Sequence, residues 1–129
     1  MTEDQIKIFE KVQAQLISLY QELGMLSKKS SNDALNKFKL KFINSTLSDA
    51  NRILDEQYKP FNSFDSFDDE ELPTTSDVTM ILGQYLNGLE NLRADNIERK
   101  EKRVDFKFIG YDWYWIGTKI KTAPPKKLK

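Results

Sequence analysis

The segment from residue 74 to residue 103 constrains the fold most, because its apolar residues recur at intervals of three and four. This spacing places them on one face of a helix. Pro73 ends whatever precedes the segment, a hydroxyl residue at 74–76 can cap the helix, and Asp77 suits its first turn. We predict a helix over residues 76–102 at the centre of the core. Its stripe consists of Val78, Ile81, Leu82, Tyr85, Leu86, Leu89, Leu92, Asn96 and Ile97.

Two further helices are expected before it. Thr2 and Gln5 have the spacing of a capping box, so we predict a helix over residues 3–23 that ends before Gly24. A second helix is predicted over residues 33–57, because three-four spacing continues although part of it alternates like a strand. The apolar stripes are Ile6, Phe9, Val12, Leu16, Leu19, Tyr20 and Leu23, then Leu35, Phe38, Phe42, Ile43, Leu47, Ala50, Ile53 and Leu54.

Residues 58–73 form an acidic, phenylalanine-rich loop. Phe61, Phe64 and Phe67 are interleaved with acidic residues, whereas a disordered acidic linker has few aromatic residues. We therefore predict an ordered crossing loop whose phenylalanines hold it against the helices. Carboxylates also suggest calcium, but an EF-hand loop needs a central glycine, and none lies between Gly24 and Gly83.

The period changes to strand spacing after the third helix. Val104, Phe106 and Phe108 alternate with charged residues, and turns are expected near Gly110 and Gly117. This pattern predicts three short antiparallel strands over residues 104–109, 112–116 and 118–122. A stiff, basic and frayed tail is expected over residues 123–129.

The composition excludes several classes of site. The chain contains no cysteine and no histidine, which removes disulfides, thiolate nucleophiles, the common zinc sites and histidine-based catalysis. We expect no enzymatic activity, no cofactor and no metal. The N-terminal sequence is polar, and no apolar run approaches the length of a membrane span, so a cytoplasmic protein without membrane contact is expected.

Charge is segregated although the formal net charge is zero. Residues 59–98 contain 2 basic against 9 acidic residues, whereas residues 99–129 contain 10 against 3. The acidic loop at residues 65–71 could therefore cover the basic C-terminal region, and the sequence leaves this open.

The most unusual local composition is an aromatic cluster beside lysines near the C-terminus. Both tryptophans lie two residues apart and share one face of a strand, with Tyr114 on the other face. One face is expected to pack on the helices, and aromatic residues left on the other would form a contact surface. The candidate partner-binding residues are Tyr111, Trp113, Tyr114, Trp115, Lys119 and Lys121.

Residues 1–129 are thus predicted to form a single mainly α domain of the α+β class. Three long helices form an irregular bundle, and a small antiparallel β-meander follows at the C-terminus. The expected function is a non-enzymatic cytosolic protein-binding module, of the kind found among immunity proteins, antitoxins and accessory proteins of mobile elements. The alternative is a nucleic-acid-binding accessory protein that uses the aromatic and basic C-terminal sheet. The length of the helices also allows a homodimer.

Overall fold

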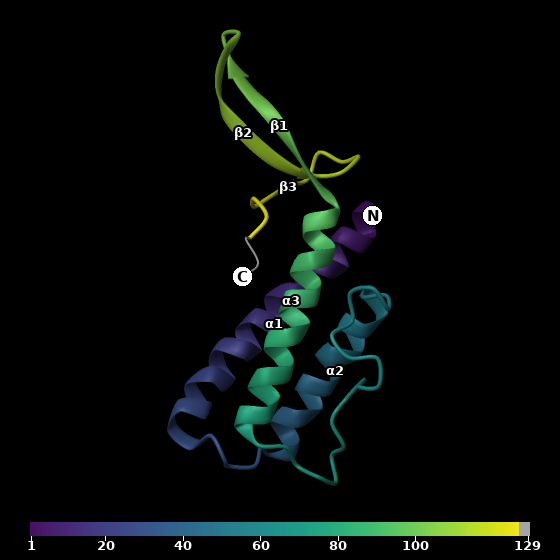
Figure 1. The fold of residues 1–129 in the computed structure, drawn as a ribbon, viewed down its shortest axis with the longest axis vertical. Helices are drawn as coiled ribbons and strands as arrows, with labels where there is room; N and C mark the ends of the chain where they lie inside the picture. Colours follow the sequence, from purple (N-terminus) through teal and green to yellow (C-terminus); the bar gives the residue numbers. More distant parts are fainter. Residues whose placement is uncertain (127–129) are drawn as a thin grey trace.

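Three helices are followed by a three-stranded antiparallel sheet in the computed structural model, which describes residues 1–126 (Figure 1). The elements are α1 (Glu3–Ser30), α2 (Lys37–Ile53), α3 (Thr75–Asp95), β1 (Ile97–Val104), β2 (Lys107–Trp115) and β3 (Lys121–Thr122). The strands follow one another in the sheet as β1-β2-β3. This arrangement confirms the predicted mainly α member of the α+β class with a C-terminal β-meander.

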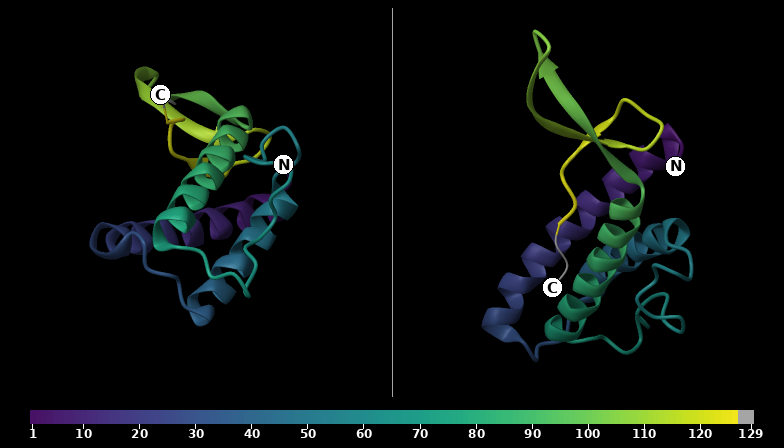
Figure 2. Two further views of the ribbon diagram at one scale, coloured as in Figure 1. Left: turned by 60° about the horizontal axis from the view of Figure 1, so that its bottom comes forward. Right: turned by 45° about the horizontal axis from the view of Figure 1, so that its top comes forward.

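The core lies between the three helices, with α3 against α1 and α2 beside them (Figure 2). The apolar stripe of α3 is buried as predicted, and Leu82, Tyr85 and Leu89 have no exposed surface. Burial of such side chains is the main source of stability in a bundle. The other large core side chains that are almost fully buried are Ile6, Phe9, Leu16, Leu40, Ile43, Leu47, Val78 and Trp115.

Each helix begins at a side chain that caps its first turn. The predicted capping box is present, because Thr2 Oγ1 accepts from the Gln5 N–H at 3.1 Å and Gln5 Oε1 accepts from the Thr2 N–H at 2.8 Å. Asn36 caps α2 and Thr74 caps α3 in the same way. These caps satisfy amides that the helix itself cannot bond.

Two helix ends differ from the predicted ones. α1 continues through Gly24 to Ser30, because Leu23 is buried and Leu26 packs on the core beyond that glycine. α2 begins at Lys37 rather than at residue 33. The preceding residues pair with the segment before α3 instead, through the Leu35 N–H, which donates to the Pro73 carbonyl at 2.8 Å.

α2 is also rotated relative to the expected stripe. Phe38 and Phe42 were predicted to face inward, yet they are 72% and 52% exposed and lie edge to face, with ring centroids 5.1 Å apart. Leu40 is fully buried in their place and continues the stripe of Ile43 and Leu47. Phe38 and Leu40 are two residues apart, so a helix cannot turn both toward the core. The smaller Leu40 faces the core, and Phe38 faces solvent.

The loop between α2 and α3 is held against α2, as predicted for Phe64 and Phe67 but not for Phe61. Phe64 and Phe67 are half-buried on the core and contact each other, whereas Phe61 is exposed. Asn44 fixes the loop by exchanging two hydrogen bonds of 2.9 Å with the backbone of Phe67. At the other end of the loop, Tyr58 donates to Asp95 at 2.6 Å, a hydrogen bond that raises the pKa of Tyr58 to about 12.

Gly88 of α3 gives a direct test of how this loop packs. A Cβ atom at this position would collide with the backbone carbonyl of Tyr58, which cannot rotate away. We expect Gly88→Ala to lower the free energy of unfolding by about 1–3 kcal/mol, although alanine ordinarily stabilises a helix. Gly83→Ala is the matched control, because its Cβ would lie at an ordinary 3.8 Å from the Tyr20 ring. Urea unfolding of both variants should give opposite signs, and equal shifts would contradict the packing.

The junction between α3 and the sheet lies earlier than predicted. The helix ends at Asp95 rather than at residue 102, and β1 begins at Ile97. Asn96 forms the cap, with its side-chain amide donating to the Leu92 carbonyl at 2.7 Å. Residues 98–103 are all charged, so they show neither a helical nor a strand period of apolar residues. The predicted helix therefore runs on through them. They form the outer strand of the sheet instead.

The strand bounds shift accordingly. The segment predicted as the first strand contains the turn at Asp105 and Phe106, and the predicted second strand lies in β2 except for its last residue, Ile116. Gly110, predicted as a turn, lies within β2 beside a bulge at which Ile109 is the extra residue. The predicted third strand is reduced to Lys121–Thr122 after a turn at Gly117.

Candidate functional site

β1 and β2 form a long hairpin that projects away from the helical bundle (Figures 1 and 2). The two strands pair through eight residue positions, from Ile97 opposite Trp115 at the base to Val104 opposite Lys107 near the tip. Only the first part of this length lies against the helices. The outer part is exposed to solvent on both faces.

The base of the hairpin is anchored by Trp115. Its side chain is 1% exposed, lies edge to face on Phe9 at 5.1 Å between ring centroids, and donates from Nε1 to Glu10 at 3.3 Å. Ile97 beside it is also buried. Trp115 was placed on the candidate contact surface by the sequence pattern, but it belongs to the core and fixes the hairpin to α1.

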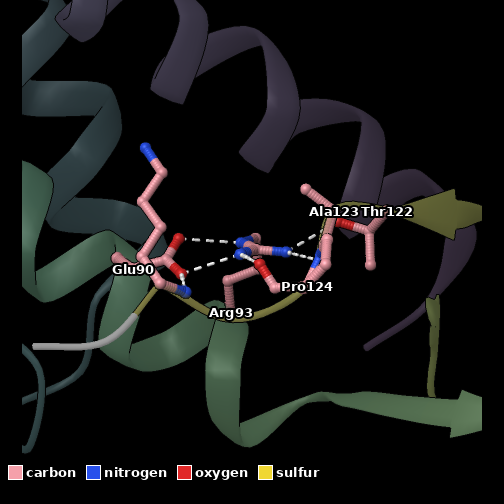
Figure 3. A network of polar contacts seen from close by, with 6 residues as sticks. Glu90, Arg93, Thr122, Ala123 and Pro124 are labelled. Atoms are coloured by element: carbon pink, nitrogen blue, oxygen red, sulfur yellow. Dashed lines mark hydrogen bonds and ion pairs between the residues drawn. The ribbon is translucent and has the colours of Figure 1, made fainter.

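A second anchor lies behind the base, where Arg93 of α3 holds the C-terminal segment (Figure 3). Arg93 is 4% exposed and donates five hydrogen bonds of 2.7–2.9 Å, two to Glu90 and three to the hydroxyl of Thr122 and the carbonyls of Ala123 and Pro124. Glu90 in turn accepts from the Lys126 N–H at 3.1 Å. The expectation of a tail frayed from residue 123 is therefore wrong up to residue 126, and residues 127–129 lie outside the described part.

The face of the hairpin that continues outward from Trp115 carries stacked side chains. The Arg99 guanidinium lies over the Tyr111 ring, 3.9 Å from its centroid, and Phe108 lies edge to face on the same ring at 5.0 Å. Trp113 connects this row to the core and is half-buried. Such contacts between neighbouring strands stiffen a two-stranded ribbon that would otherwise be marginal in water.

The opposite face is more polar. Lys100 lies over the half-buried Tyr114 ring at 5.1 Å from its centroid, and Lys121 pairs with Asp112 at 3.5 Å. Lys119 is exposed in the turn between β2 and β3. Lys119 and Lys121 therefore lie near the base, whereas the accessible ring of Tyr111 lies on the other face.

The tip of the hairpin breaks the usual sequence rules for such turns. Asp105 and Phe106 both have positive φ, of 52° and 65°, the pattern of a two-residue type I′ turn that favours asparagine and glycine. Phe106 is nevertheless 96% exposed there. A bulky residue in this conformation is strained and gains no burial within the chain, which is typical of a functional position.

Apolar side chains are concentrated around this tip. The exposed large apolar residues of the outer hairpin are Val104 (53%), Phe106 (96%), Phe108 (49%), Ile109 (53%) and Tyr111 (46%). The sequence pattern identified Tyr111 but missed the others, because it assigned Val104 to Ile109 to a strand with one buried face. We call these five residues the tip patch.

The acidic loop does not cover this hairpin. Loop residues Asp65 and Phe67 are bonded to Asn51 and Asn44 of α2, and the views place this loop beside α2 and the hairpin beyond the other end of the bundle. The hairpin itself is nearly neutral, with five basic and four acidic residues between 97 and 115. The excess of positive charge in the C-terminal part of the sequence therefore comes largely from the residues after β2.

The residues described, 1–126, include no group of three acidic side chains placed to hold a metal ion. Across the same residues, no helix has both the length and the apolar character that a membrane crossing requires. Comparisons with protein-family models, with curated proteins and with solved structures each find no match to this chain.

Proposed function

We propose that the protein is a non-enzymatic binding module whose hairpin is the arm that contacts another protein. The observation that carries this proposal is Phe106, a large apolar side chain held fully exposed at a turn where glycine would be more stable. Apolar and aromatic side chains concentrated at one exposed place are typical of the energetic centre of a protein interface. Charged residues along the strands would form the polar rim of that interface.

The anchoring of the hairpin supports the same proposal. Trp115 and the Arg93 network fix its base to α1 and α3, and the stack of Arg99, Tyr111 and Phe108 stiffens its outer part. An arm that is already ordered loses little conformational entropy when it binds. The helices thus act as a scaffold that presents the tip patch.

Nucleic-acid binding by the hairpin is the second candidate, favoured by Arg99, Lys100, Lys102, Arg103 and Lys107. Two observations make it weaker. Four acidic residues are interleaved with these five, and one face of the Tyr111 ring is already occupied by a guanidinium. A stacking platform for single strands needs open aromatic faces in a positive groove.

Phe106→Gly separates binding from folding. Because glycine adopts positive φ without strain, we expect the free energy of unfolding to rise by about 1 kcal/mol. Affinity for a protein partner should fall by about 2 kcal/mol or more, as for an aromatic anchor. Phe38→Ala, a change of another exposed phenylalanine far from the hairpin, is the control and should leave binding unchanged.

The measurement is capture on the immobilised protein from native lysate, followed by titration of the captured partner with both variants and the unaltered chain. Labelled single-stranded oligonucleotides are titrated in parallel at two salt concentrations. Oligonucleotide binding that weakens steeply with salt would favour the second candidate. If the Phe106→Gly variant binds the captured protein with unchanged affinity, the first candidate, a protein-binding arm, is wrong.

A further inference from the structure

The outer edge of β1 has backbone groups that point away from the sheet. β1 is an edge strand in the order β1-β2-β3, and the Ile116 N–H donates to the Asn96 carbonyl at 2.9 Å. Asn96 and every second residue after it therefore direct their backbone N–H and C=O groups toward β2. Ile97, Arg99 and Glu101 direct their N–H and C=O groups to the open side. Such an edge is a template for another strand.

The charges along this edge are opposite in sign about Lys100. Arg99 and Glu101 flank it with opposite charges, and so do Glu98 and Lys102. If two such strands pair antiparallel about a two-fold axis at Lys100, Arg99 of each copy lies opposite Glu101 of the other. Glu98 likewise lies opposite Lys102. The strand is thus complementary to a second copy of itself in one register.

That register gives the most opposite-charge pairs. With the axis at Glu101, Glu101 lies opposite itself and Lys100 opposite Lys102, so that like charges meet. With the axis at Arg99, Arg99 lies opposite itself, and Glu98 with Lys100 is the one opposite-charge row. With the axis at Lys100, the only like pair among these rows is Lys100 with its own copy. Asp112 is the β2 partner of each Lys100 and lies beside that pair on the same face.

The same register carries the tip of one hairpin to the helical end of the other copy. Val104 comes opposite Asn96, so the turn that carries Phe106 lies just beyond the start of the other β1. In Figures 1 and 2 the line of β1, continued past its first residue, runs toward the start of α1 and the end of α2. A cavity of about 300 Å³ opens there, lined by Met1, Gln5, Ile8, Asp49, Arg52, Ile53 and Leu92.

We propose that the partner of the hairpin is a second copy of this chain. The two β1 edges pair antiparallel about Lys100, and each Phe106 seats in the apolar cavity of the other copy. This inference rests on the proposed role of the hairpin as a protein-binding arm, and it names the partner of that arm. It also explains the strained phenylalanine at the tip, because its side chain would be buried only in the dimer.

A disulfide across the axis tests the register. The chain has no cysteine, so a single introduced thiol reports one position. Residue 100 of each copy would lie opposite residue 100 of the other as a non-hydrogen-bonded pair, with about 4.5 Å between the Cα atoms. Lys100→Cys should therefore form an intermolecular disulfide under mild oxidation. Lys102→Cys is the matched control on the same face of the same strand, where the two copies would lie about 13 Å apart. Crosslinking in the control at the rate of Lys100→Cys would overturn the register.

Charge exchange tests the pairing in solution, with sedimentation equilibrium as the readout. Glu98→Lys and Lys102→Glu should each weaken the dimer about tenfold, because each places like charges opposite one another twice. An equal mixture of the two variants should restore association, since the mixed dimer has opposite charges in both rows. Residues 98 and 102 lie about 13 Å apart along one strand, so this rescue cannot arise within a chain. A mixture that behaves as the average of its components would overturn the proposal.

The outcomes also distinguish this inference from the role of the hairpin itself. The unaltered chain could stay monomeric at its highest soluble concentration while Phe106→Gly abolishes capture of another protein. That result would support the hairpin as a protein-binding arm and show that pairing with a second copy is wrong. Charge-dependent dimers that Phe106→Gly leaves unchanged would overturn the seating of the tip in the cavity. If Phe106→Gly weakens neither capture nor dimerisation, and the dimers do not depend on the charges of β1, both proposals are wrong.

Discussion

The Arg93→Ala variant is expected to lose about 3–5 kcal/mol of the free energy of unfolding, because removing one member of a buried ion pair leaves the other charge without compensation. All five hydrogen bonds of the guanidinium would be lost, including those to the backbone of Ala123 and Pro124. Urea unfolding measures the loss, and hydrogen exchange of residues 121–126 measures release of the segment.

Replacing both members of the pair gives the control for Arg93→Ala. Glu90→Leu combined with Arg93→Met removes both charges and keeps side-chain volume, so it should cost less than Arg93→Ala alone. The segment that ends at Lys126 should be released in either case, because both variants remove the guanidinium that donates to its carbonyls. An Arg93→Ala variant within about 1 kcal/mol of the unaltered protein would contradict the network.

The same network predicts a response to acid. Burial raises the pKa of Glu90, but the hydrogen bond from Arg93, the bond from the Lys126 N–H and both positive charges lower it further, so that the net pKa is depressed. A carboxyl group whose pKa is lower in the folded state stabilises the fold above its unfolded pKa. This contribution is lost as the pH falls through the folded pKa. Acidification should therefore release residues 121–126 in the unaltered protein. In Arg93→Ala, where this segment is already free, no separate release step is expected.

Trp115→Ala is expected to have a similarly large effect, about 3–5 kcal/mol, as for other buried aromatic truncations. Its ring fills the junction between the hairpin and α1 against Phe9. Loss of the ring should also loosen the orientation of the hairpin, so partner affinity should fall although the tip patch is unchanged. Trp113→Ala is the control on the same face, and it should cost less because its side chain is only half-buried. Equal destabilisation of the two variants in urea would contradict the assigned anchor.

The helical half of the fold could be predicted because burial leaves a periodic record in the sequence. Val78 to Ile97 repeat at helical spacing, and the caps at Thr2 and Thr74 mark where helices begin. The end of α1 was wrongly predicted at Gly24. A glycine inside a helix costs only about 1 kcal/mol, and the packing of the residues around it outweighs this cost. The rotation of α2 was missed for a similar reason, since Phe38 and Leu40 compete for one buried face.

The hairpin and its anchors were harder to predict. β1 consists almost entirely of charged residues, so neither face carried an apolar period, and Asp105-Phe106 is not a usual turn dipeptide. Glu90 and Arg93 are three residues apart and resemble an exposed helix pair in the sequence. They are buried because the chain returns to them about thirty residues later, which no local pattern records. The predicted cluster of aromatic residues did lie on the hairpin, but its tip patch depends on a turn that the pattern did not reveal.

Hydrogen exchange of the free and the partner-bound protein tests the central role of the hairpin most directly. If the partner is a second copy, the comparison is between dilute and concentrated protein. The account predicts new protection of the outward amides of β1, including Arg99 and Glu101, and of the turn from Val104 to Ile109, with little change along α3. Protection confined to the helices, with the hairpin amides exchanging as in the free protein, would contradict it.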